Sequence, residues 1–122
     1  MNATSESVLN ELICISVPKN QAGISDLDHY MDKSEHVEDF ILTRRQYDYL
    51  KPIFTIMNSE LGLLISEFEE EQIPSGKVGR ALNIAKTYQE KHHLDPASSG
   101  ISQLISALAY AFEREMRVYL FF

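Results

Sequence analysis

The sequence predicts an all-α protein, an antiparallel bundle of about five helices that forms a single domain over residues 1–122. Apolar residues recur at intervals of three and four along most of the chain, and Ser or Thr stands before several of these runs, where a helix N-cap is expected. The connections between the runs are short, which favours packing of successive helices as neighbours. A length of 122 residues fits one domain, and 44% apolar residues suffice for one core.

The N-terminal third is expected to hold short elements. Residues 1–6 are polar and expected to fray, and the apolar spacing from Val8 to Ile13 predicts a first helix. Residues 12–17 are β-branched enough to form a strand as well, although we favour a helix, and Pro18 ends either element. Residues 19–23 are interpreted as a loop, after which Ser25 is placed to cap a helical turn over residues 26–33.

The middle of the chain carries a longer helical pattern. Apolar residues share one face from residue 34 toward Pro52, and a capping box of Thr43 with Gln46 predicts a break at residue 43. Pro52 leaves two alternatives, a helix kinked at this residue or two separate helices. A helix over residues 53–68 follows, and its C-terminal end at residues 69–71 is acidic, which opposes the helix dipole.

Two helices are predicted in the last third. The first begins at Ser75 and ends in the basic residues 91–93, and the second begins at Ser98 or Ser99 and extends to Tyr119. Residues 118–122 are too apolar for a free tail, because aromatic rings gain about 1.5–3 kcal/mol each on burial. This segment is therefore expected to dock, either in the core or against a second copy of the chain.

Charge is distributed unevenly. Residues 1–71 hold fourteen acidic and five basic residues, a net charge of −9, whereas residues 72–122 hold four and six, a net charge of +2. An acidic chain with a pI near 5.0 is not expected to bind nucleic acid directly. One cysteine, no membrane-spanning apolar run and no signal-peptide pattern at the start lead us to expect a cytoplasmic protein without disulfides.

The acidic segments are the candidate partner-binding site. An array of carboxylates focuses a negative potential that speeds capture of a basic partner by about 10–10³-fold, and tyrosines among them supply contact area. Solvated helix faces are the alternative interpretation of the same charges. The candidate residues are Asp26, Asp28, Asp32, Glu35, Glu38, Asp39, Glu67, Glu69, Glu70, Glu71, Tyr30, Tyr47 and Tyr49.

No motif predicts an enzyme, a cofactor or a metal. Cys14 lies in an apolar run and is expected to be buried and inert, and the glycines and lysine of residues 75–80 lack the order of a phosphate loop. His29, Asp32 and His36 span too much of a helix for one ion. The Glu-x-x-His spacing that ends at His93 lacks the further ligands of a di-iron bundle.

In general character, the acidic segments over residues 26–39 and 67–71 and the predicted helical layout resemble bacterial immunity proteins, which neutralise nuclease toxins of colicin and contact-dependent inhibition systems. The resemblance implies a cytosolic inhibitor, without catalytic activity, that occludes a basic toxin domain. A DNA-mimic or regulatory adaptor protein is an alternative, as is a helical bundle that binds a metal or small ligand.

Overall fold

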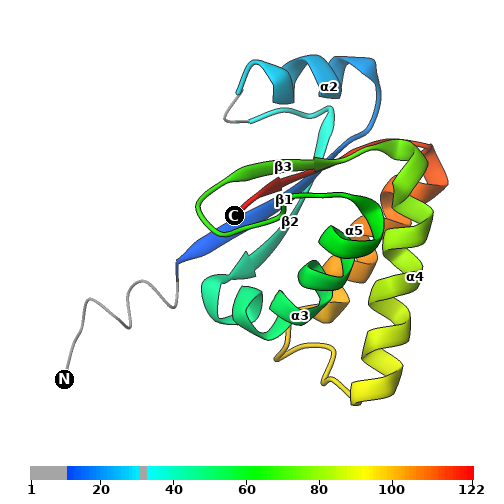
Figure 1. Cartoon of the computed structure of the whole chain (residues 1–122). Coiled ribbons are helices and arrows are strands. Elements are labelled where there is room, and N and C mark those ends of the chain that lie inside the picture. The colour runs from blue at the N-terminus through cyan, green and yellow to red at the C-terminus, as the bar shows by residue number, and fades with distance from the viewer. Residues whose placement is uncertain (1–10, 31–32) are drawn as a thin grey trace.

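The computed structural model describes residues 11–30 and 33–122, and in this part of the chain it joins a four-stranded antiparallel sheet to four helices (Figure 1). The prediction of an all-α bundle is therefore wrong. The elements in chain order are β1 (Leu12–Pro18), α2 (Gln21–Asp28), β2 (Val37–Thr43), α3 (Arg44–Leu61), β3 (Glu70–Ile73), α4 (Ser75–His92), α5 (Ile101–Arg114) and β4 (Val118–Phe121).

The sheet has the order β2-β1-β4-β3, so its two central strands come from opposite ends of the described chain. Ile15 of β1 pairs with Phe40 of β2 on one side and with Leu120 of β4 on the other. Ile73 of β3 pairs with Val118 of β4. The pairing of the two central strands, β1 and β4, therefore joins residues about a hundred positions apart in sequence.

One face of the sheet packs against the helices. Ile13, Ile15 and Val17 alternate along β1 and are all buried, as the two-residue period of a strand requires. Helices α3 and α5 cover this face, and α4 packs alongside them (Figure 1). The largest fully buried side chains of the helices are Phe54, Leu50, Ile53, Met57, Ile101, Leu104 and Leu108.

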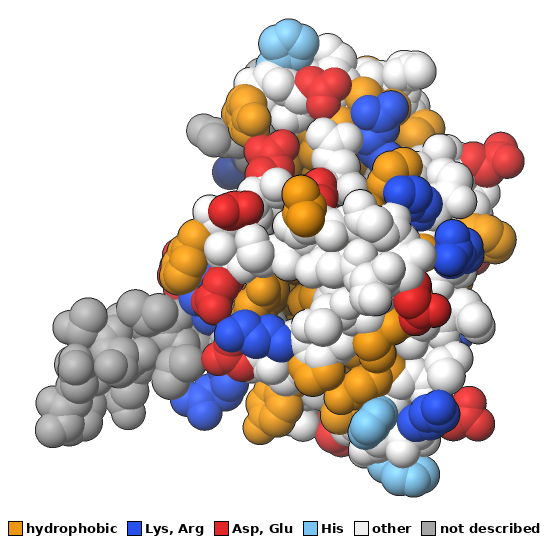
Figure 2. All heavy atoms as spheres, in the orientation of Figure 1, with side chains coloured by type: hydrophobic (Ala, Val, Ile, Leu, Met, Phe, Trp, Pro, Cys, Tyr) orange, Lys and Arg blue, Asp and Glu red, His pale blue; other side chains and the backbone are white. Residues whose placement is uncertain are grey.

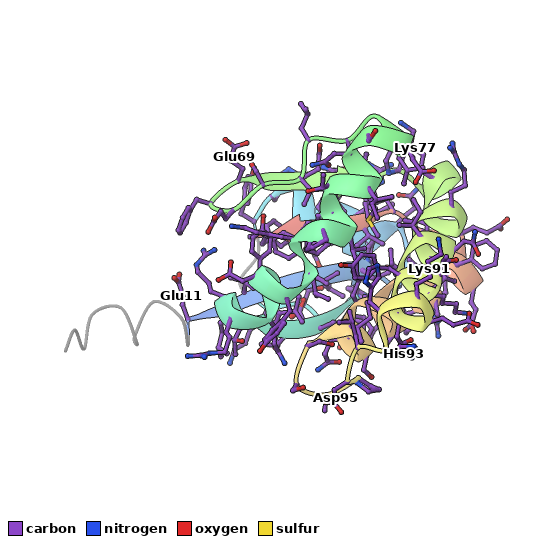
Figure 3. All side chains as sticks on the ribbon, turned by 60° about the horizontal axis from the view of Figure 1, so that its bottom comes forward. Glu11, Glu69, Lys77, Lys91, His93 and Asp95 are labelled. Carbon is purple, nitrogen blue, oxygen red and sulfur yellow. The ribbon has the colours of Figure 1, made fainter. Side chains whose placement is uncertain are left out.

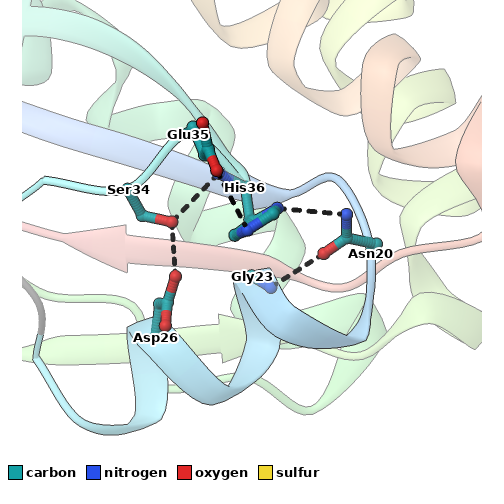
Figure 4. A network of polar contacts seen from close by, with 6 residues as sticks. All are labelled: Asn20, Gly23, Asp26, Ser34, Glu35 and His36. Atoms are coloured by element: carbon teal, nitrogen blue, oxygen red, sulfur yellow. Dashed lines mark hydrogen bonds and ion pairs between the residues drawn. The ribbon is translucent and has the colours of Figure 1, made fainter.

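Helix α2 lies at the end of the sheet and is tied to the segment that follows it. Asn20 is its N-cap and accepts a hydrogen bond from the backbone N–H of Gly23 (3.0 Å), while its side-chain amide lies 3.4 Å from the His36 ring (Figure 4). Ser34 donates to Asp26 (2.5 Å). The loop predicted over residues 19–23 is confined to residues 19–20, and Ser25 as the cap is wrong, because Asn20 supplies an earlier cap.

Two further segments that we expected to be helical are strands. Residues 12–17 form β1, and the helix that we favoured there is wrong. Residues 37–43 form β2, in which Phe40 and Leu42 point toward the helices and Ile41 points away. The residues before position 11, which include the segment 1–6 expected to fray and most of the first predicted helix, lie outside the described residues.

The predicted break at Thr43 is confirmed and marks the start of α3. Gln46 N–H donates to Thr43 Oγ1 (3.1 Å), and Thr43 N–H donates to Gln46 Oε1 (2.9 Å), which is the capping box. Helix α3 continues through Pro52 as one element, so the alternative of two helices is wrong. It ends at Leu61 rather than residue 68, because Gly62 adopts a left-handed conformation (φ 68°).

The acidic residues 69–71 do not end a helix. Glu70 and Glu71 belong to β3, so the expected conflict with a helix dipole does not arise. The two later helices are confirmed: α4 spans Ser75–His92 with Lys91 and His92 in its last turn, although Pro74 rather than Ser75 is its N-cap. Helix α5 begins at Ile101 with Gly100 as its N-cap, so the predicted start at Ser98 or Ser99 is wrong. It ends at Arg114, short of the predicted Tyr119, since Glu115 turns left-handed (φ 54°).

Residues 118–122 belong to the core. Val118, Tyr119 and Leu120 of β4 are fully buried, and the Phe122 ring packs on Tyr47 and Phe54. The alternative of a contact between two copies is therefore not needed to bury this segment. Of the helices in residues 11–30 and 33–122, none has the length and apolar character needed to cross a membrane.

Candidate functional site: the open face of the sheet

Helices α3, α4 and α5 leave the second face of the sheet uncovered. We call this surface the open face; its strand residues are Cys14, Ser16, Asp39, Ile41, Glu70, Gln72, Tyr119 and Phe121. They share one face because antiparallel partners such as Ser16 and Asp39 project on the same side of the sheet. Helix α2 crosses only one end of this face, and its Leu27 is buried there.

The open face is mixed in character, with hydrophobic side chains beside carboxylates. Figure 2 shows acidic and hydrophobic side chains next to one another over α2 and β3. Tyr30 is 70% exposed, as is Phe68 in the loop before β3, and Ile41 is 42% exposed. Tyr30 and Phe68 are of the residue types that anchor protein interfaces, although exposed aromatic residues, Tyr49 and Phe112, also occur on the helical layer.

Two of the acidic residues predicted to bind a partner, Asp39 and Asp28, accept hydrogen bonds within the fold. Asp39 Oδ1 accepts a hydrogen bond from Ser16 Oγ (2.6 Å), and Asp28 accepts one from the Tyr119 hydroxyl (2.6 Å). Burial, followed by the hydrogen bond to Asp28 and its charge, raises the pKa of Tyr119 to about 12. These carboxylates therefore combine a structural role with a position on or beside the open face.

Other predicted acidic residues form ion pairs away from the centre of this face. Glu38 lies 3.8 Å from Lys19 Nζ, and Glu67 lies 3.1 Å from Lys51 Nζ. Glu71 accepts backbone hydrogen bonds from Leu64 (2.7 Å) and Gln72 (2.9 Å). Glu35 lies 3.6 Å from His36 Nε2, and Asp32 lies outside the described residues.

Glu69 and Glu70 remain exposed at the β3 end of the open face. The Glu70 carboxylate raises the pKa of the Tyr30 hydroxyl through a hydrogen bond and through its negative charge, which places Tyr30 against this end of the sheet. Figure 3 shows Glu11 and Glu69 on one side of the molecule and Lys77 and Lys91 on the opposite side. These two glutamates, from residues 1–71, therefore lie apart from these two lysines, from residues 72–122.

The three tyrosines predicted to bind a partner lie in different environments. Tyr30 lies exposed beside the open face, as expected of an interface residue. Tyr47 is 3% exposed and stacks on Phe54 in the core, so it cannot contact a partner. Tyr49 is exposed on α3, in the helical layer, and does not join the open face.

A pocket of about 330 Å³ lies between α2, the segment that follows it and the open face. Leu27, Val37 and Phe121 form its apolar walls, and Cys14, Ser16, Tyr30, Ser34 and Asp39 contribute polar groups. Burial is the main cause that raises the pKa of Cys14 to about 11, so this thiol is protonated near neutral pH. Its side chain is half-buried at the pocket wall rather than fully buried as expected. The lining residues are Cys14, Ser16, Leu27, Tyr30, Ser34, Val37, Asp39 and Phe121.

A second hollow, of about 350 Å³, continues along the sheet toward Arg44. The Arg44 guanidinium donates from Nε to Glu11 (2.9 Å) and lies 4.1 Å from the Phe68 ring centre. Phe68 holds this position with a left-handed backbone (φ 63°). Sequence reasoning missed both Phe68 and Phe121; an aromatic residue inside the acidic run of residues 67–71 was the available signal for Phe68.

The described residues contain no group of three His, Cys, Asp or Glu side chains placed to hold a metal ion. His29 Nδ1 is 2.7 Å from the Ser25 carbonyl oxygen, and His36 contacts Asn20 and Glu35, so each ring has a local partner. No protein-family model, no curated protein and no solved structure matches this chain. Its function is therefore argued from the open face.

Proposed function

We propose that this chain is a binding protein without catalytic activity that captures a basic protein on its open face and blocks the partner's own site, as an immunity protein does with a toxin domain. The helical layout that contributed to the resemblance to immunity proteins is absent, so the proposal depends on charge and surface. One observation carries it: the exposed side chains of Tyr30 and Phe68 and the exposed carboxylates of Asp39, Glu69 and Glu70 lie on or beside the sheet face that α3, α4 and α5 leave uncovered.

Charge supports a basic partner. Glu69, Glu70 and Asp39 are exposed on or beside this face; Arg44 pairs with Glu11 and Lys19 with Glu38, while Lys33 is exposed in the segment that follows α2. A negative potential of this kind accelerates encounter with a positive surface and repels anions. A toxin cleft that binds nucleic acid phosphates is positive and fits this requirement.

Aromatic contact supports tight binding rather than attraction alone. Exposed charges mainly set the association rate, whereas affinity requires a centre from which water is excluded. Tyr30 and Phe68 present rings that are 70% exposed, with Ile41 and Leu12 on the same side of β1 and β2. A partner that covers these side chains removes apolar area from water at about 25 cal/mol per Å².

The test is a binding measurement with the product of the neighbouring gene, since inhibitors of this class are encoded beside their toxins. We expect a 1:1 complex whose dissociation constant rises steeply between 50 and 500 mM salt, as about 10 Å of Debye screening at 0.1 M implies. Replacing Glu69 and Glu70 together by Gln is expected to lower the association rate about fivefold.

The matched control removes two charges from the helical layer. Glu60 and Glu90 are exposed on α3 and α4, and the double variant E60Q/E90Q makes the same change in net charge. It is expected to leave the association rate within about twofold of the unmodified protein. No complex at low salt, or an equal loss in the control variant, would contradict the proposed function.

A further inference from the structure

We infer that the pocket beneath α2 receives one arginine or lysine side chain of the basic partner, with the Asp39 carboxylate as its ion-pair acceptor; this inference rests on the proposed function. It names the chemistry of a single anchor within the wider interface. The pocket volume of about 330 Å³ lies at the lower end of sites that hold small molecules, about 300–1,000 Å³, and suits one long side chain.

The walls of the pocket fit the apolar stem of such a side chain. Leu27 of α2 and Val37 of β2 line it on the side of the helix, and Phe121 of β4 lines it from the sheet. Lysine and arginine carry three or four methylene groups that gain stability on apolar surfaces while the charged head stays hydrated or paired. A hydrated inorganic cation would gain no stability from these apolar walls.

Asp39 is positioned to bind the charged head. Its Oδ1 atom accepts a hydrogen bond from the Ser16 hydroxyl (2.6 Å), and Ser16 Oγ in turn lies 3.2 Å from Cys14 Sγ. These contacts with β1 hold the carboxylate in place. The residue is nevertheless exposed, which leaves lone pairs available to a partner. A charge-assisted hydrogen bond to a guanidinium or ammonium is about twice as strong as a neutral one.

The surroundings favour a positive charge. No lysine or arginine is among the residues that line the pocket. The C-terminal turn of α2 contributes Leu27, and helix C-termini carry a partial negative charge. Asp26 and Asp28 lie on the same helix and accept hydrogen bonds from Ser34 and Tyr119. The cations near the pocket are Arg117, beside the Tyr119 hydroxyl, and Lys33, which is exposed next to Ser34.

Tyr30 closes the rim of the pocket with a side chain suited to a cation. Its ring is 70% exposed and lines the pocket, and a guanidinium that lies over such a face gains about 0.5–2 kcal/mol from the ring. The pocket therefore offers a carboxylate, an aromatic face and apolar walls to one occupant. Arginine uses all three features, and lysine uses the carboxylate and the walls.

The first experiment tests the pocket without a partner. N-acetyl-arginine amide is titrated into the protein up to about 50 mM, and its neutral counterpart N-acetyl-citrulline amide, which has nearly the same shape, is the matched probe. We expect saturable NMR shifts at Cys14, Leu27 and Asp39 with the arginine compound, at least fivefold weaker binding in Asp39→Asn, and unchanged binding in Glu90→Gln. Equal shifts with the citrulline compound would overturn the inference.

Cys14 provides a second readout because it is the one cysteine of the chain and lines the pocket. The arginine compound is expected to slow alkylation of Cys14 at pH 9 at least twofold, and the citrulline compound is not. If Asp39→Asn fails to fold by circular dichroism, Tyr30→Ala replaces it; this exposed rim residue is expected to weaken arginine binding about threefold.

The second experiment uses the partner and separates the two proposals. Asp39→Asn is expected to weaken the partner complex about 30-fold. If the complex forms, depends on Glu69 and Glu70, and is unchanged by Asp39→Asn, the proposed function holds and the anchor assignment is wrong. If the arginine compound binds but no partner complex forms, the proposed function is wrong and the pocket keeps its assignment as a guanidinium site.

Discussion

Gly23 is a point of close approach between helix α2 and the rest of the chain, and replacing it by Ala should loosen that contact. A Cβ atom at this position would lie 2.1 Å from the His36 carbonyl oxygen and 3.0 Å from Pro18 Cα. Ordinary carbon–oxygen contacts are about 3.3 Å or more, so the backbone would have to separate by roughly 1 Å. The His36 carbonyl is not free to move, since it accepts a hydrogen bond from Lys19 N–H at 2.8 Å.

The magnitude follows from two opposing effects. Overpacking against backbone costs up to about 3 kcal/mol, and Ala gains about 1 kcal/mol over Gly inside a helix. We expect Gly23→Ala to lower the free energy of unfolding by about 2 kcal/mol, measured by urea denaturation. Because α2 covers the pocket that contains Cys14, alkylation of this thiol should also become faster in the variant.

Gly76→Ala is the matched control. Gly76 lies in the first turn of α4, and a Cβ atom there meets nothing within 4 Å. Its stability should be unchanged or up to about 0.5 kcal/mol higher. If Gly23→Ala is as stable as the unmodified protein, the close approach of α2 to residue 36 is not a real constraint.

Three further outcomes follow from the structure. Thr43→Ala should lower the free energy of unfolding by about 1 kcal/mol in urea denaturation, because the capping box with Gln46 is lost; no change would contradict its role. Cys14, with its pKa raised to about 11, should react with iodoacetamide about 100-fold more slowly at pH 8 in the native protein than in urea, and equal rates would contradict its burial. Tyr119 is raised in pKa from 10.0 to about 12, so its contribution to stability is present below pH 10 and is lost as pH rises toward 12; Tyr119→Phe should flatten this part of the stability profile, and an unaltered profile would contradict the assignment.

Local sequence signals predicted the helices that carry strong caps and long apolar stripes. The capping box at Thr43 correctly marked the start of α3, and the periodic residues of α4 and α5 correctly identified those helices. The ends were less predictable: α3 and α5 stop at Gly62 and Glu115, each in a left-handed conformation, whereas the apolar spacing continued beyond both.

Apart from residues 12–17, for which a strand was the alternative to the favoured helix, the strands were not predicted, because the spacing of apolar residues did not distinguish the period of a strand from that of a helix. In residues 37–41 the apolar positions 37, 40 and 41 fit a helix, yet in the structure Phe40 and Leu42 share the buried side and Ile41 faces out. The decisive information is the pairing of β1 with β2 and with β4, which lies in no local window.

The acidic surface was predicted in part. Glu69, Glu70, Asp39 and Tyr30 do gather at one face, whereas Tyr47 is buried and Glu67 is paired with Lys51. The predicted all-helical arrangement could not separate the residues on the open face from the buried or paired ones, because alternate residues of a strand lie on opposite faces of the sheet. The aromatic Phe121 became part of the face only because β4 lies between β1 and β3.

The central position of β4 has a consequence for biosynthesis. A ribosome releases residues 12–73 long before residues 118–121, so during translation β1 and β3 lack the neighbour that joins them. Unpaired strand edges attract other chains, and slow pairing over a long loop prolongs the exposure. The emerging polypeptide is therefore vulnerable until its final strand inserts, and aggregation during expression should respond more to changes in β4 than to changes in α4.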